Sequence, residues 1–119
     1  MLLSDSVYRF TLTGVQQPTS TPVPQSLSLF ENYPNPFNPT TTIVFDVPEG
    51  SSAGGVSLRV FDLLGRHVAL LADGPLAPGR HSVVWNGRDA GGRELPSGVY
   101  FYRLTGGGKT LSRRMMIAR

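Results

Sequence analysis

Short runs of alternating apolar and polar residues, separated by glycine- and proline-rich turns, are the feature that most constrains this chain. The alternation has a period of two, which puts every second side chain on the same face of a β-strand. The 14 glycines and 10 prolines gather between these runs, where they serve as turn residues. No stretch shows a convincing helical period, so the sequence predicts an all-β protein.

The runs predict about seven short strands joined by turns, a pattern that favours an immunoglobulin-like antiparallel β-sandwich. A small barrel is the alternative. We expect Trp85 to be a core residue, because it shares an apolar strand face with His81 and Val83. The alternation is imperfect near Leu70 and Leu71, where we expect a β-bulge. The strands are predicted over residues 7–12, 41–47, 56–61, 66–71, 81–85, 99–104 and 111–117.

An irregular, proline-rich segment opens the main domain at residues 31–39. Its three prolines lack a backbone N–H, which forbids a helix and limits the hydrogen bonds of a sheet. The segment also contains two aromatic residues, Tyr33 and Phe37. We expect both to be apolar anchors that hold the segment against the core.

The distribution of proline, threonine and serine divides the chain into three parts. Residues 1–13 are expected to be the last strand of a preceding domain, or a strand that folds back onto the main one. Residues 14–26 are expected to be an extended linker, and residues 27–119 the folded domain. The N-terminus lacks the features of a signal peptide, and no apolar run approaches the ~20 residues that span a bilayer. Any export signal is therefore expected on a longer parent chain.

The sequence offers no clear catalytic or cofactor site. The chain has no cysteine and only two histidines, and it lacks a local nucleophile motif such as Gly-x-Ser-x-Gly. The loop at residues 86–92 supplies oxygens and glycines, but it has one carboxylate and no glutamate at calcium-loop spacing. We therefore expect no enzyme activity, no metal, no cofactor and no small-molecule substrate.

The positive charge of the chain is concentrated at its end. The net charge is +3, and Lys109, Arg113, Arg114 and Arg119 lie in the last eleven residues without an acidic neighbour. Such an end can contact an anionic partner, although solvated charges on a last strand are the simpler interpretation. Nucleic-acid binding is not expected, because Tyr100 and Tyr102 are predicted to lie in the core rather than to stack on bases.

Several motifs resemble the C-terminal sorting domains of the type IX secretion (Por secretion) system. The opening Asn-Tyr-Pro-Asn-Pro-Phe-Asn-Pro-Thr-Thr over residues 32–41 is similar to the start of these domains. The hairpin at 60–68, the stretches at 79–89 and 96–104, and the basic end at 113–117 resemble their later strands. The later motifs are also similar to the immunoglobulin-like domain of the flagellar hook-capping scaffold, FlgD.

The resemblance implies a non-catalytic, C-terminal sorting module of an exported bacterial protein. Such a protein passes through the periplasm and reaches the outer-membrane surface or the medium. The implied partners are an outer-membrane secretion translocon and a sortase-like protease, and the domain itself is expected to be monomeric. Recognition is expected at an exposed edge and the charged last strand. A structural scaffold or adhesive module is the alternative. The candidate recognition residues are Gly98, Tyr100, Lys109, Arg113 and Arg114.

Overall fold

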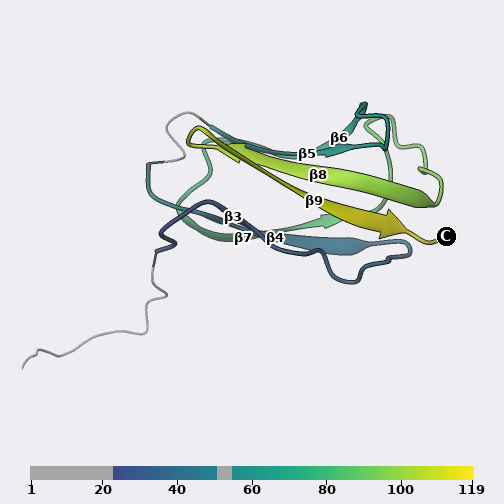
Figure 1. The fold of residues 1–119 in the computed structure, drawn as a ribbon, viewed down its shortest axis with the longest axis horizontal. Helices are drawn as coiled ribbons and strands as arrows, with labels where there is room; N and C mark the ends of the chain where they lie inside the picture. The colour runs from purple at the N-terminus through teal and green to yellow at the C-terminus, as the bar shows by residue number, and fades with distance from the viewer. Residues whose placement is uncertain (1–22, 51–54) are drawn as a thin grey trace, which may run out of the picture.

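The computed structural model describes residues 23–50 and 55–119, and these residues form strands, turns and loops without a helix. Seven strands make two layers that face each other (Figure 1). The expected strand remnant at 1–13 and most of the expected linker at 14–26 lie outside the described residues. The strands are β3 (Ser28–Leu29), β4 (Thr41–Val47), β5 (Val56–Phe61), β6 (His67–Gly74), β7 (Gly79–Trp85), β8 (Gly98–Gly106) and β9 (Lys109–Ile117).

The two layers are separate antiparallel sheets with the orders β3-β4-β7 and β6-β5-β8-β9. The chain crosses from one sheet to the other between β4 and β5, between β6 and β7, and between β7 and β8. This arrangement is an immunoglobulin-like β-sandwich rather than a closed barrel. The predicted fold class is therefore confirmed, and strand β9 lies at an edge of the larger sheet.

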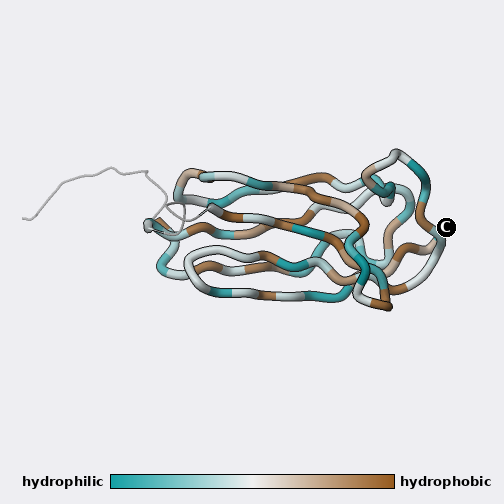
Figure 2. The backbone as a smooth tube through the Cα atoms, turned by 90° about the horizontal axis from the view of Figure 1, so that it is seen from above, coloured by the Kyte–Doolittle hydropathy of each residue, from teal (hydrophilic) through white to brown (hydrophobic). Residues whose placement is uncertain are grey.

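Alternation along the strands builds the core between the sheets. Figure 2 shows hydrophobic and hydrophilic residues succeeding one another along the same strands. The predicted inward faces of β4, β5, β8 and β9 are the buried ones, and Trp85 is only 3 % exposed. The largest fully buried side chains include Tyr102, Phe37, Phe45, Ile43, Leu58, Leu104, Met115 and Ile117.

The proline-rich opening segment is held by one aromatic anchor instead of the two expected. Phe37 is buried and packs near Trp85, with 5.7 Å between the ring centroids. The expectation for Tyr33 is wrong, because its side chain is 79 % exposed. Its backbone N–H and carbonyl both bond to Thr42, which adds Tyr33 to the edge of β4 with the ring outward. Asn32 is buried in its place.

Tyr102 fixes this segment from within the core. Its ring is fully buried, while its hydroxyl donates to the Phe30 carbonyl (2.7 Å) and accepts from the Asn32 N–H (2.9 Å). The Asn32 side chain continues the network by donating to Thr41 Oγ1 (3.0 Å). Moving the segment would break all of these bonds and leave buried groups unpaired, which is costly, so the network specifies one position for it. Within the described residues one atom of the network, Asn32 Oδ1, is buried without a partner.

Strand β6 is longer and less regular than the sequence indicated. It extends to Gly74, because Asp73 and Gly74 pair with the start of β5. Arg59 pairs with Leu70 while Leu58 pairs with Ala72, so one extra residue lies between them. This register shift confirms the bulge predicted near Leu70 and Leu71. A second shift lies between Val60 and Phe61.

We predict that Trp85→Ala lowers the free energy of unfolding by about 3–5 kcal/mol, because it empties a large volume of the core. The change also removes the donor for the Arg88 carbonyl, which the indole N–H contacts at 3.0 Å. Urea denaturation followed by circular dichroism measures the loss. Val84→Ala is the matched control, because Val84 lies on the other face of β7 and is 67 % exposed. Equal losses of unfolding free energy in the two variants would contradict the burial of Trp85.

Candidate functional site

Strand β9 presents a partly open edge. At one end, Met116 points its backbone away from β8: its N–H donates to Asn35 Oδ1 (3.1 Å) and its carbonyl accepts from the Phe37 N–H (3.1 Å). The direction of the backbone N–H and C=O groups alternates from residue to residue along an antiparallel strand. Those of Thr110, Ser112 and Arg114 therefore also point away from β8, toward the open edge. Within the described residues, the outward N–H and C=O groups of these three positions have no hydrogen-bond partner.

The three candidate cations of β9 have different environments. Arg113 belongs to the inward-facing set of side chains, and its Nε donates to the Leu29 carbonyl at 2.6 Å. This bond joins the edge of the larger sheet to β3 of the smaller one. Arg114 faces outward opposite Phe101, and Lys109 starts the strand at the glycine hairpin. Arg113 therefore has a structural role that sequence alternation did not reveal.

Gly98 and Tyr100 lie toward the opposite end of β9 from Lys109. Gly98 pairs with Ile117 and has a φ of 153°, a backbone conformation that residues with a Cβ rarely adopt. Tyr100 is 5 % exposed and its hydroxyl donates to the Pro96 carbonyl at 2.8 Å. Burial raises the pKa of the Tyr100 phenol. The five candidates thus do not form one cluster, and the Tyr100 ring is part of the core.

A surface hollow of about 350 Å³ lies beside this second group. Gly98 and Tyr100 line it from β8, and the hairpin after β5 lines it from the other side. Leu63 and Leu64 at that hairpin are 68 % and 78 % exposed. Apolar side chains beside a hollow are typical of contact surfaces, so this end of the sandwich offers an apolar contact in addition to the charged edge.

Two loops at this end share an Asp-x-x-Gly-Arg motif, at residues 62–66 and 89–93. In the first, Asp62 Oδ1 accepts from the backbone N–H groups of Leu64 and Arg66, and Oδ2 from Arg66 Nε. Asp89 makes the same three contacts with Gly91 and Arg93. Each carboxylate therefore organises its own turn. The signal was the repeated Asp and Arg spacing around a glycine.

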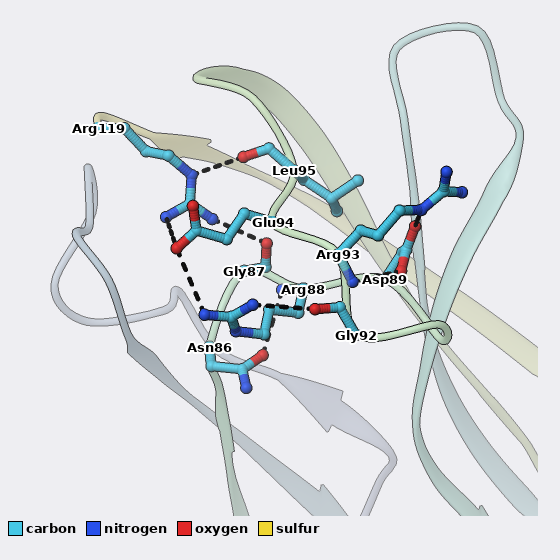
Figure 3. A network of polar contacts seen from close by, with 9 residues as sticks. All are labelled: Asn86, Gly87, Arg88, Asp89, Gly92, Arg93, Glu94, Leu95 and Arg119. Carbon is cyan, nitrogen blue, oxygen red and sulfur yellow. Dashed lines mark hydrogen bonds and ion pairs between the residues drawn. The ribbon is translucent and has the colours of Figure 1, made fainter.

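The loop at 86–95 is also tied to the chain end (Figure 3). Arg119 donates from Nε to the Leu95 carbonyl (2.6 Å) and from Nη2 to the Gly87 carbonyl (2.9 Å). Glu94 lies between Arg88 and Arg119, at 3.4 Å and 3.8 Å. Several oxygens that resembled a calcium loop in the sequence thus accept from N–H donors of the chain itself: Asn86 Oδ1, Asp89 Oδ1 and the Gly87 and Gly92 carbonyls.

Among the described residues, no group of three or more His, Cys, Asp or Glu side chains lies close enough to hold a metal ion. His81 stacks on Phe45 with 5.4 Å between centroids, and its Nε2 lies 2.7 Å from the Ala77 carbonyl oxygen. Among these residues, no helix is long and apolar enough to cross a membrane.

The geometry defines a single immunoglobulin-like β-sandwich, and comparison with known proteins gives its family. Residues 34–109, more than half of the chain, match the FlgD Ig-like domain family. The chain therefore belongs to that family. No curated protein matches it.

Two solved structures from Porphyromonas gingivalis contain a similar fold. Dimeric latent PorU matches with a TM-score of 0.60 and 18 % identity over 86 % of this chain. PorZ, described as an essential bacterial surface component of the type-IX secretion system, matches with a TM-score of 0.50 and 25 % identity over 76 %. The match covers 10 % of the PorU chain and 11 % of the PorZ chain. In both, the similar domain is a small part of a larger protein.

We predict that Arg113→Gln lowers the free energy of unfolding by roughly 1–2 kcal/mol, because it removes a charge-assisted hydrogen bond to the Leu29 carbonyl. Arg114→Gln is the matched control, since its side chain faces solvent, and it is expected to change stability by less than about 0.5 kcal/mol. Chemical denaturation of both variants measures the difference. If the two variants unfold alike, the bond to Leu29 contributes nothing.

The Asp62 turn generates a pH prediction. The Arg66 backbone N–H bond is the largest influence that holds the pKa of Asp62 below its ordinary value. The ionised Asp62 carboxylate stabilises the fold fully at pH values above the pKa that Asp62 has in the unfolded chain. This contribution is lost as the pH falls through the lower pKa that Asp62 has in the folded protein. In a carboxyl titration by NMR, Arg66→Gln should raise this pKa only in part, because the backbone donor remains. A return to the ordinary pKa would show that the side chain dominates.

Proposed function

We propose that this chain is a non-catalytic sorting module that directs an exported bacterial protein across the outer membrane through the type IX secretion system. The observation that carries the proposal is the edge of β9. Its outward backbone groups at Thr110, Ser112 and Arg114 lack partners among the described residues, and Lys109 and Arg114 add positive charge. An open strand edge is a docking template for another strand.

The regularity of β9 supports an edge-docking role. The other edge strand of its sheet, β6, is interrupted by two register shifts, which protects an edge from pairing. Strand β9 pairs with β8 without a shift over its whole length. Among the described residues, the edge of β9 is therefore open to an incoming strand only up to Arg114, because Asn35 and Phe37 cover it beyond that point.

The relatives set the biological context of the proposal. PorZ, a surface component of the type-IX secretion system, carries a domain of similar fold as a small part of its chain. We infer that this chain serves in the same way as one module of a larger exported protein, which passes the periplasm and reaches the cell surface or the medium. The proposed partners are the translocon and a sortase-like protease.

A structural role is the second candidate, and the family match favours it. Residues 34–109 match the FlgD Ig-like domain family, in line with the resemblance of the later motifs to the flagellar hook-capping scaffold. A scaffold module needs the same sandwich but has no need of an open, charged edge on β9. The two proposals therefore differ in what the edge does.

We predict that the chain, fused to a periplasmic reporter in a host with a type IX system, brings the reporter to the cell surface. Ser112→Pro should trap the fusion in the periplasm, because it removes an outward N–H without removing a bond to β8. Ser112→Ala is the matched control and should export normally. Protease accessibility on intact cells measures surface exposure, and the melting temperature of each purified variant checks the fold.

Charge is tested separately from the backbone edge. Replacing Lys109 and Arg114 by Gln should reduce export while leaving the melting temperature nearly unchanged, since exposed charges contribute little to stability. Arg113 is left intact because it supports the fold. If the unaltered fusion remains periplasmic in a competent host, the sorting proposal fails and the scaffold role becomes the better account.

A further inference from the structure

The outer face of the larger sheet carries three arginines at neighbouring positions, here called the arginine face: Arg59, Arg103 and Arg114. Strand register places Arg59 of β5 directly opposite Arg103 of β8. Arg114 of β9 lies one row further along, opposite Phe101. Like charges directly opposite each other in a sheet repel and destabilise the pair, so this arrangement is unfavourable unless something neutralises it.

No carboxylate among the described residues forms an ion pair with these three arginines. Five other arginines each have a carboxylate within 4 Å, but the arginine face forms no ion pair there. The outward-facing side chains of β5, β8 and β9 include no acidic residue, and the one carboxylate on the outer face of neighbouring β6, Asp73 opposite Ser57, forms no ion pair with the arginine face. The outward positions of β5, β8 and β9 are Ser57, Arg59, Phe61, Val99, Phe101, Arg103, Thr105, Thr110, Ser112, Arg114 and Met116.

Apolar surface is interleaved with the charges. Phe61 and Phe101 lie side by side in register, and the Arg103 guanidinium lies over the Phe61 ring, 4.3 Å from its centroid. Stacking of this kind leaves the N–H donors at the edge of a guanidinium free to bind an anion. Beside Arg114 a hollow of about 400 Å³ is lined by Asn35, Pro36, Val99, Met115 and Met116, and Met116 is 43 % exposed.

We propose that the arginine face binds an acidic protein segment, with carboxylates on the arginines and an apolar side chain in the hollow beside Arg114. Planar guanidinium groups match carboxylates in two parallel hydrogen bonds. A bound carboxylate also removes the repulsion between Arg59 and Arg103. This interaction uses the face of the sheet rather than the edge of β9, and it stands whether or not the chain is a sorting module.

The same geometry disfavours single-stranded nucleic acid as the partner. Base stacking requires an exposed aromatic ring face, but Arg103 covers Phe61 and both phenylalanines are half-buried. Insertion into a lipid surface is also disfavoured, because it needs a continuous apolar surface, whereas the exposed apolar side chains Leu70 and Met116 lie on the two opposite edge strands of the sheet. Both remain as outcomes of the test.

The test measures binding of fluorescein-labelled oligo-glutamate to the full chain by fluorescence anisotropy, with oligo-glutamine as the neutral control peptide. We expect binding of oligo-glutamate alone, weakening as salt rises. The triple variant R59Q/R103Q/R114Q should lose about tenfold or more in affinity. The matched control is R66Q/R88Q/R93Q, which removes the same charge from arginines that already have an acidic partner, and it should change affinity less than about twofold.

Several results would overturn the proposal. Equal weakening by both triple variants would mean that net charge alone attracts the peptide. Equal binding of oligo-glutamine would remove the role of the carboxylates. A single-stranded DNA oligonucleotide or phosphatidylglycerol vesicles that bind more tightly, and depend on the same three arginines, would assign the face to phosphate instead. Melting temperatures of both variants confirm that each is folded before binding is measured.

Discussion

The position of the proline-rich opening segment depends on one buried hydroxyl. Tyr102 reaches across the sandwich and bonds both the Phe30 carbonyl and the Asn32 N–H. The bond to the Asn32 N–H is buried and the bond to the Phe30 carbonyl is part-buried. Losing the hydroxyl would therefore leave at least the Asn32 N–H buried without a partner, which is more costly than losing a surface bond. The contact thereby determines where Asn35 and Phe37 lie, and these residues cover one end of the β9 edge.

The extent of the open edge follows from that arrangement. Beyond the covered end, the edge-facing backbone groups of β9 have no partner among the described residues as far as the hairpin. Near the middle of the strand, Arg113 joins the two sheets by donating to the Leu29 carbonyl. The three charges of the strand thus divide between support and contact: Arg113 holds the two sheets together, while Lys109 and Arg114 face solvent. The basic end is therefore not one patch, because Arg113 has a structural role and only Lys109 and Arg114 are accessible to a partner.

The larger sheet has two surfaces with different chemistry. Its inner face is apolar and meets the smaller sheet, and its outer face carries Arg59, Arg103 and Arg114 among half-buried phenylalanines. The edge of β9 and the arginine face meet at Arg114. A partner strand at the edge and an acidic segment on the face would therefore both contact the side chain of Arg114, and would either compete for it or share it.

The sequence by itself determined the fold class and most of the core. Strict alternation decides which face of a strand is apolar, so Ile43, Leu58, Trp85 and Met115 were assigned correctly from their spacing alone. Local turn chemistry fixed the hairpins in the same way. Only the tertiary structure decided that Tyr33 faces solvent and that Arg113 bonds Leu29, because both depend on which backbone groups of distant strands remain unpaired. The cluster of Arg59, Arg103 and Arg114 was equally hidden, since strand register, a long-range property, brings together residues that lie far apart in the chain.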